Sequence, residues 1–173
     1  MYKLRSSGRG FTLVELVAVL ALLAIISAAA FSRFSSPSVY QSRILLDSLE
    51  NSLRLAQRSS LSHHASSLSW QLTRTSSNEW LYELLVDGNA QISETVRADS
   101  ALAYTVPLAA GGSLTGSLDT GDSLTVTYDN QGYLASVTDS ASGGAINGAL
   151  SLALSTHDLC VSSGGFAYAS TCR

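Results

Sequence analysis

The sequence predicts an α+β fold in which one long N-terminal helix packs on an antiparallel β domain. Three features predict it. Residues 11–31 are apolar or small almost throughout, residues 38–62 repeat leucine at helical spacing, and the chain after residue 64 alternates apolar and polar residues. The expected segments are a leader over 1–10, a membrane-spanning half of the helix over 11–37, an amphipathic half over 38–64 and a β-rich globular domain over 65–173.

The apolar segment has the length of a membrane-spanning helix, because residues 11–31 exceed the ~20 that a helix needs to cross a bilayer. The basic residues before it, Lys3, Arg5 and Arg9, are expected to stay in the cytoplasm and to leave the bulk of the chain outside. Glu15 interrupts the segment. Since a charge inside a membrane helix costs roughly 2.5–3.5 kcal/mol on insertion scales, Glu15 requires a partner or a purpose.

The amphipathic half of the helix follows a proline. Pro37 lacks an amide donor and disfavours helix at the residue before it, so a break is expected between Phe31 and Val39. Beyond the break, apolar residues recur every three or four positions on one face, and Glu50 and Arg54 have the favourable i,i+4 spacing of an ion pair. The apolar face consists of Leu45 or Leu46, Leu49, Leu53 and Ala56.

After His64 the apolar period changes to two, which is typical of half-buried strands. Trp70 and Trp80 lie in the clearest alternating runs and are expected in the core. Two segments rich in glycine and serine, 109–121 and 140–148, are expected to be surface loops. The expected strands are 68–73, 80–86, 92–96, 101–106, 124–128, 133–138, 149–155 and 166–169, with turns at 87–89 and 129–132.

The charge distribution argues against a nucleic-acid partner. From Ala65 onward the chain has three basic residues, all arginine, against ten acidic ones. A surface of this kind repels the phosphate backbone that basic stripes attract. We therefore expect no nucleic acid to bind the globular domain.

Residues 10–15, Gly-Phe-Thr-Leu-Val-Glu, lie between a basic leader and an apolar segment and resemble the prepilin signature of type IV pilins and type II secretion pseudopilins. The resemblance covers residues 8–31. It implies cleavage by a prepilin peptidase between Gly10 and Phe11 and N-methylation of Phe11. It also implies an assembly salt bridge between Glu15, the fifth residue of the mature chain, and the Phe11 amine of a neighbouring subunit.

The same resemblance implies a pilin-like fold and a place in the cell. The precursor would be a single-pass inner-membrane protein with a periplasmic C-terminal domain, and the mature chain would join a pilus or pseudopilus. Its partners would be the prepilin peptidase, other pilins or pseudopilins and the assembly platform. No cofactor or metal is implied, and the chain is expected to be a substrate of an enzyme and not an enzyme itself.

The only two cysteines, Cys160 and Cys172, are expected to pair in a disulfide if the domain is exported to an oxidising compartment. A loop of this length stabilises a fold by ~3 kcal/mol in the chain-entropy estimate. The alternative is two buried, unpaired thiols. A disulfide-closed segment near the C-terminus also resembles the type IV pilin pattern.

Two other interpretations of the N-terminus remain open. In one, residues 16–26 are the core of an ordinary secretory signal that is cleaved near Ala28–Ala30. In the other, residues 11–31 are a plain membrane anchor. Neither explains why Glu15 lies inside the apolar run or why Gly10 directly precedes a phenylalanine.

Finer features favour a minor subunit. Residues 53–57 and 126–132 resemble minor pilins of the FimT and GspH group, and residues 25–28 resemble those of the mannose-sensitive haemagglutinin (MSHA) system. Ser32 stands where many major pilins have a proline, which favours a minor pilin or pseudopilin. The alternatives are a type II secretion pseudopilin, a tip adhesin that binds through residues 109–121 and the Cys160–Cys172 loop, and a secreted β domain.

The sequence carries no recognisable catalytic or metal motif. Adjacent histidines, His63 and His64, point about 100° apart on a helix and cannot chelate one metal as an i,i+4 pair does. His157 and Asp158 stand near Cys160, but a cysteine held in a disulfide is no nucleophile. Three aspartates, Asp119, Asp122 and Asp129, are better explained by turns than by calcium binding.

Overall fold

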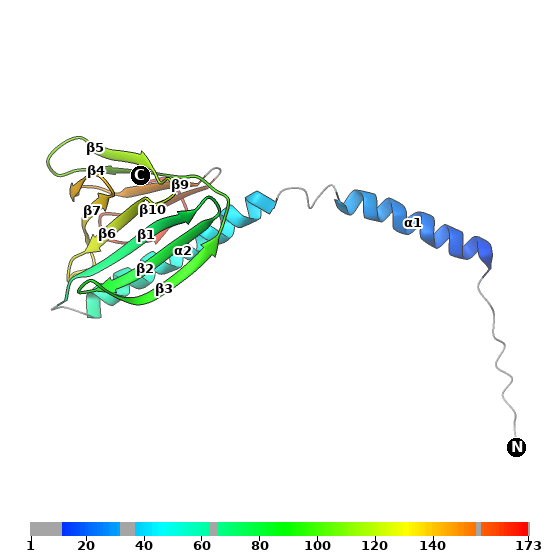
Figure 1. Cartoon of the computed structure of the whole chain (residues 1–173), viewed down its shortest axis with the longest axis horizontal. Helices are drawn as coiled ribbons and strands as arrows, with labels where there is room; N and C mark the ends of the chain where they lie inside the picture. The colour runs from blue at the N-terminus through cyan, green and yellow to red at the C-terminus, as the bar shows by residue number, and fades with distance from the viewer. Residues whose placement is uncertain (1–11, 32–36, 63–65, 155–156, 173) are drawn as a thin grey trace, which may run out of the picture. The chain divides into compact units, whose positions relative to one another are not determined.

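A computed structural model gives the fold (Figure 1). It describes residues 12–31, 37–62, 66–154 and 157–172, the side chains of residues 28–31 and 37–39 excepted. The chain divides into two compact units, Met1–Pro37 and Ser38–Arg173. The expectations for Gly10, Phe11, His63 and His64 lie outside the described residues.

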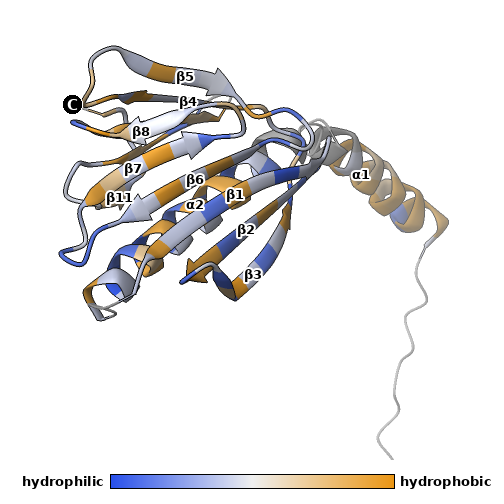
Figure 2. Cartoon of the chain, turned by 60° about the vertical axis from the view of Figure 1, so that its left-hand side comes forward, coloured by the Kyte–Doolittle hydropathy of each residue, from blue (hydrophilic) through white to orange (hydrophobic). Residues whose placement is uncertain are grey.

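Helix α1 spans Leu13–Phe31 and is apolar on every side, as the hydropathy colours of Figure 2 show. A helix without a polar face requires an apolar environment all round. Its large apolar side chains from Leu13 to Ile26 are all exposed. Within the described part of the chain, no helix meets the length and apolarity that a membrane crossing requires.

Helix α2 spans Pro37–Ser62 and carries the core of the second unit. Pro37 is its first residue, the position where a missing amide donor costs no hydrogen bond. The predicted apolar face is confirmed, because each of its residues is fully buried, and Glu50 forms the predicted ion pair with Arg54. Figures 1 and 2 show α2 lying along one face of a sheet, where Trp70 Nε1 donates a hydrogen bond to Ser52 Oγ at 2.9 Å.

That sheet has six antiparallel strands in the order β3-β2-β1-β6-β7-β8. Trp70 in β1 and Trp80 in β2 are fully buried, as predicted. Its edges are the long strand β3 and the short strand β8. The strands are β1 Leu68–Ser76, β2 Glu79–Val86, β3 Asn89–Arg97, β6 Ser123–Tyr128, β7 Leu134–Asp139 and β8 Gly143–Ala145.

The second sheet has five antiparallel strands in the order β11-β10-β9-β4-β5. Its buried side chains join those of α2 and the first sheet in one hydrophobic core. The α+β fold predicted from the sequence is therefore confirmed. The strands are β4 Leu102–Pro107, β5 Ser113–Ser117, β9 Leu150–Leu154, β10 His157–Val161 and β11 Ala167–Tyr168.

The prediction of surface loops at 109–121 and 140–148 was wrong in part, because the first contains β5 and the second contains β8. Two of the glycines that suggested loops lie against side chains of neighbouring strands. A Cβ atom at Gly116 would stand 2.5 Å from the Tyr104 hydroxyl, and one at Gly143 would stand 2.3 Å from Thr138 Cγ2. Strand β10 was not predicted at all, since only its last three residues are buried and apolar.

Cys160 and Cys172 are joined by a disulfide, with their Cα atoms 5.1 Å apart. Cys160 is fully buried in β10. The bond therefore closes the last part of the chain onto the core of the second unit.

Replacing both cysteines, Cys160→Ser and Cys172→Ser, is expected to lower the free energy of unfolding by ~2–4 kcal/mol, because the unfolded chain gains freedom. Urea titration followed by tryptophan fluorescence measures it, since both tryptophans lie in this unit. Full thiol labelling of both wild-type cysteines under non-reducing denaturation would contradict the bond.

Candidate functional site

The first turn of α1 brings Thr12 and Glu15 together. The Glu15 amide donates to the Thr12 hydroxyl at 3.3 Å and to the Thr12 carbonyl at 3.1 Å. Thr-x-x-Glu is the sequence of a capping box, in which a threonine side chain satisfies an amide at the start of a helix. The carboxylate also lies where the helix dipole favours negative charge.

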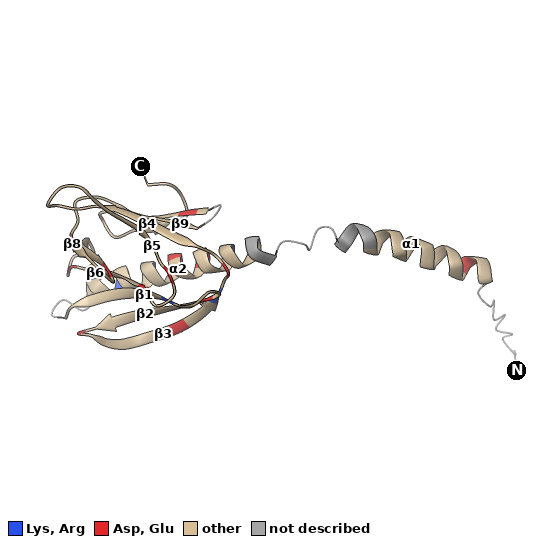
Figure 3. Ribbon diagram, turned by 45° about the horizontal axis from the view of Figure 1, so that its top comes forward, with Lys and Arg blue, Asp and Glu red and all other residues tan. Residues whose placement is uncertain are grey.

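Glu15 is the single charged residue of α1, as Figure 3 shows for its described part. Its side chain is exposed, and no cation among the described residues pairs with it. The hydrogen bonds to Thr12 hold the first turn of α1 through the Glu15 backbone and do not use its carboxylate. They leave the carboxylate available to a partner outside the chain.

A second feature is the disulfide segment, residues 160–172, which is hydrogen-bonded to one flank of α2. Arg54 Nε donates to the Ala167 carbonyl at 3.0 Å, and Gln57 Nε2 donates to the Gly164 carbonyl at 2.7 Å. Gly165 has a φ of +81°, and a Cβ atom there would stand 2.0 Å from the Gly132 carbonyl oxygen. Only glycine fits there, so α2, the β6–β7 turn and the disulfide segment meet in one close contact.

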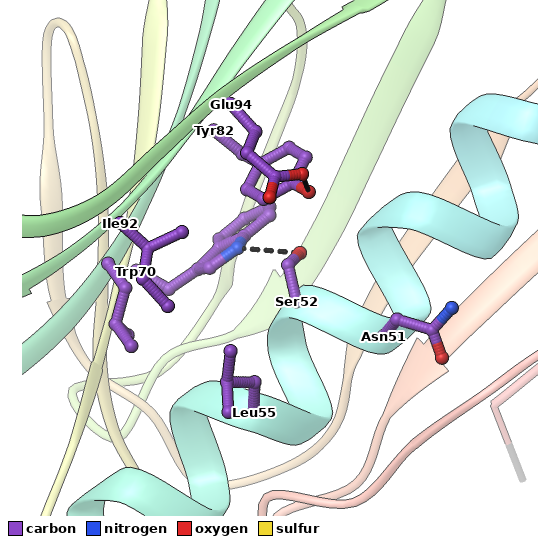
Figure 4. Close-up of a pocket in the computed structure, with 8 residues that line it drawn as sticks. Asn51, Ser52, Leu55, Trp70, Tyr82, Ile92 and Glu94 are labelled. Carbon is purple, nitrogen blue, oxygen red and sulfur yellow. Dashed lines mark hydrogen bonds between the residues drawn. The ribbon is translucent and has the colours of Figure 1, made fainter.

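The opposite flank of α2 borders a groove, shown in Figure 4. Its volume is about 150 Å³. The lining residues are Asn51, Ser52 and Leu55 of α2, Trp70 of β1, Tyr82 and Leu84 of β2, and Ile92 and Glu94 of β3.

Most of the polar side chains that line this groove have partners inside the molecule. The Trp70 indole donates to Ser52 Oγ, and the Ser52 hydroxyl donates to the Leu49 carbonyl at 2.9 Å. The Tyr82 hydroxyl donates to Glu94 Oε2 (Figure 4). The surface left for a ligand is therefore mainly apolar.

Three tyrosines hold their protons more tightly than free tyrosine, and burial alone raises the pKa of one of them, Tyr128, well above its usual value. Burial, together with the hydrogen bond to Glu94, raises the pKa of Tyr82 to about 12. Burial and the hydrogen bond to Asp139 likewise raise the pKa of Tyr104 to about 12. The Tyr104 hydroxyl lowers the pKa of the Asp139 carboxyl in turn, and this 2.5 Å bond ties β4 in one sheet to the end of β7 in the other.

The aspartates singled out in the sequence serve turns. Asp122 Oδ2 accepts from the Asp119 amide at 3.0 Å, and Asp129 Oδ1 accepts from the amides of Gln131 and Tyr133 at 2.9 Å. Among the described residues, no group of three His, Cys, Asp or Glu side chains could hold a metal ion.

Residues 5–31 match the family described as the prokaryotic N-terminal methylation motif. No curated protein and no solved structure matches the chain. The match supports a type IV pilin-like or pseudopilin subunit. The resemblance to FimT, GspH and MSHA pilins is not confirmed by it.

Because these tyrosine pKa values are raised, the free energy of unfolding depends on pH in the alkaline range. The unfolded chain releases a tyrosine proton near pH 10, whereas folded Tyr82 and Tyr104 keep theirs to about pH 12. The unfolded state therefore binds fewer protons between these values, and the free energy of unfolding falls as the pH rises. Urea titrations at a series of pH values should show this fall.

In the double variant Tyr82→Phe and Tyr104→Phe, the free energy of unfolding should fall less steeply with pH, because no phenol remains to ionise at either position. Tyr40→Phe, at an exposed tyrosine of α2, is the control and should leave the fall unchanged. An equal pH dependence in the double variant and the wild type would show that these tyrosines do not cause it.

Proposed function

We propose that this chain is a structural subunit of a type IV pilus of the MSHA kind, and a minor pilin within it. The observation that carries the proposal is the N-terminal methylation motif over residues 5–31. It is supported by helix α1, which forms most of that segment and whose large apolar side chains are exposed and require cover from other molecules.

The precursor is first inserted into the inner membrane. The basic leader stays in the cytoplasm, residues 11–31 cross the bilayer, and the C-terminal domain folds in the periplasm. A prepilin peptidase cuts between Gly10 and Phe11, where a glycine offers an unhindered backbone, and the Phe11 amine is then methylated. The assembly platform moves the mature chain into the filament.

Glu15 guides this assembly. The methylated amine of Phe11 in one subunit pairs with the Glu15 carboxylate of its neighbour, so that neither charge is buried alone. Packing among the leucine and valine side chains of neighbouring α1 helices supplies most of the cohesion. The role of the chain is structural, and the prepilin peptidase acts on it.

A type II secretion pseudopilin is the main alternative, because the methylation motif belongs equally to that class. A tip adhesin is favoured by a separate observation, the exposed side chains of Phe166 in the disulfide segment and of Tyr133 in the β6–β7 turn. The neighbouring genes distinguish a pilus from a secretion system, and a tip-only position in labelled filaments would identify the adhesin.

Intact-mass analysis of the full chain, recovered from membranes and from sheared filaments, tests the proposal. The expected mature chain lacks residues 1–10, begins at Phe11 and carries one added methyl group. A chain that begins near residue 31 and occurs only in the soluble fraction would identify an ordinary secretory signal and contradict the proposal.

The same experiment with Glu15→Val tests the role of the carboxylate. The variant should enter membranes at least as well as the wild type, because an apolar residue replaces a costly one, and it should still be cut at Gly10. Its amount in filaments should fall by about tenfold or more, since an incoming amine would be buried without a counter-charge. The Phe11 amine also stays unmethylated if the methylating enzyme recognises the Glu15 carboxylate.

Ser27→Val is the matched control, because it also makes α1 more apolar but leaves Glu15 in place. It should reach filaments like the wild type. Equal incorporation of Glu15→Val and Ser27→Val would show that the glutamate has no role in assembly.

A further inference from the structure

Strand β3 is an outer edge of the six-stranded sheet (Figure 1). It pairs with β2 on one side, and no described strand pairs with its other side. Residues 92–97 pair with residues 79–84 in unbroken register, and the register shifts only beyond them, between Leu84 and Leu85. Every second residue of an edge strand points its amide and carbonyl away from the sheet. An extended peptide can add a strand to such an edge.

Helix α2 runs beside β3 in the opposite direction. Near the start of the helix, Gln41 Oε1 accepts from the Asp99 amide at 3.4 Å, just beyond the end of β3. Further along the helix, Leu55 borders the groove, whose other side is formed by Ile92 and Glu94 of β3 (Figure 4). The side chains that an added strand turned toward the helix would therefore meet this flank of α2.

This flank of α2 and the facing side of β3 both carry apolar side chains that lack full cover. Ile44 and Leu55 are exposed, and they are eleven positions apart, which is close to three helical turns, so they share one flank. On β3, Ile92 and Val96 are only half-buried against the core. Apolar side chains on one face of an added strand would cover both rows.

Glu94 places a negative charge between the two apolar residues of β3. Alternate residues of a strand share a face, so Glu94 lies on the same face as Ile92 and Val96. Its side chain is exposed, its Oε2 accepts from the Tyr82 hydroxyl, and no cation among the described residues pairs with it. A charge in this place opposes a strand that brings only apolar side chains. It favours a strand that brings lysine or arginine opposite it.

These three positions define the residues that the added strand needs. Opposite Ile92, Glu94 and Val96 it requires an apolar, a basic and an apolar residue, each two positions from the next. This pattern is the same in both chain directions, so it holds for a parallel and for an antiparallel strand. In the present sequence no lysine or arginine has an apolar residue both two positions before it and two positions after it. A second copy of this chain therefore does not offer the pattern.

We propose that the β3 edge binds an extended segment of a different protein, which adds a strand to the sheet and carries lysine or arginine between two apolar residues. The cation pairs with Glu94, and the apolar side chains cover Ile92, Val96 and the flank of α2. Backbone hydrogen bonds along the edge supply affinity, and the alternate side chains supply specificity. The site does not depend on the proposed function, because every residue that forms it belongs to the second unit.

The test uses the full chain in detergent micelles and a fluorescent synthetic peptide, Thr-Val-Thr-Lys-Thr-Val-Thr, with binding followed by fluorescence anisotropy. The peptide should bind saturably. A second peptide with glutamate in place of the lysine should bind about tenfold more weakly, because it sets a like charge opposite Glu94.

A charge reversal on β3 provides the matched variant. Glu94→Lys should reverse the preference, so that the glutamate peptide binds more tightly than the lysine peptide. Glu83→Lys is the control, because Glu83 lies on the other face of the sheet, where Ser93 Oγ donates to it at 3.1 Å. It should leave the preference unchanged. Urea titration followed by tryptophan fluorescence checks that both variants are folded.

N-methylated peptides test the backbone contact in the wild-type chain. Successive amides of a strand point to opposite edges, so methyl groups on the valine and lysine amides block one edge, and methyl groups on the threonine amides block the other. One of these two peptides should lose binding and the other should keep it. Equal binding of the two, which is expected of a peptide that only fills the groove, would overturn the proposal.

Three further outcomes would also overturn it. These are no saturable binding of any of the peptides, equal binding of the lysine and glutamate peptides to the wild type, and dimers of the chain in micelles that Glu94→Lys abolishes. The dimers would assign the edge to a second copy. A chain that never reaches filaments would contradict the proposed function and would leave the peptide results standing.

Discussion

Helix α1 cannot bury its own apolar surface, and the proposed function depends on this constraint. Its apolar side chains face every direction and are exposed along the described helix. Burial of apolar surface contributes roughly 25 cal/mol per Å², so a helix of this kind is stable only where lipid or other apolar helices cover it. A carboxylate left unpaired in that environment is costly, which is the reason for proposing that Glu15 pairs with a neighbouring subunit.

The second unit is organised around α2. One face of this helix supplies the buried leucines of the core, and Ser52 binds the Trp70 indole beneath the sheet. Arg54 and Gln57 fasten the disulfide segment to one flank, while the other flank leaves a groove beside β3. The domain therefore presents two different sides to its surroundings.

The sequence predicted the parts of this fold that depend on local periodicity. The leucine face of α2 and the buried tryptophans follow from spacing alone. Strands β5 and β8 were missed because Gly116 and Gly143 suggested loops, whereas they lie against Tyr104 and Thr138 of neighbouring strands. The groove was beyond prediction, since it depends on how much of the sheet α2 covers. Gly10, Phe11 and Glu15 were recognised by motif, and their roles remain proposals.

The most direct test of the proposed function measures whether α1 is accessible to water in the cell. Leu20→Cys places a thiol in the middle of α1, and Ser93→Cys places one on the exposed surface of β3, while the native cysteines are joined to each other. A water-soluble maleimide should label position 93 fully and position 20 hardly at all, in intact membranes and in sheared filaments alike. Labelling of position 20 to the same extent as position 93 in both preparations would contradict the account.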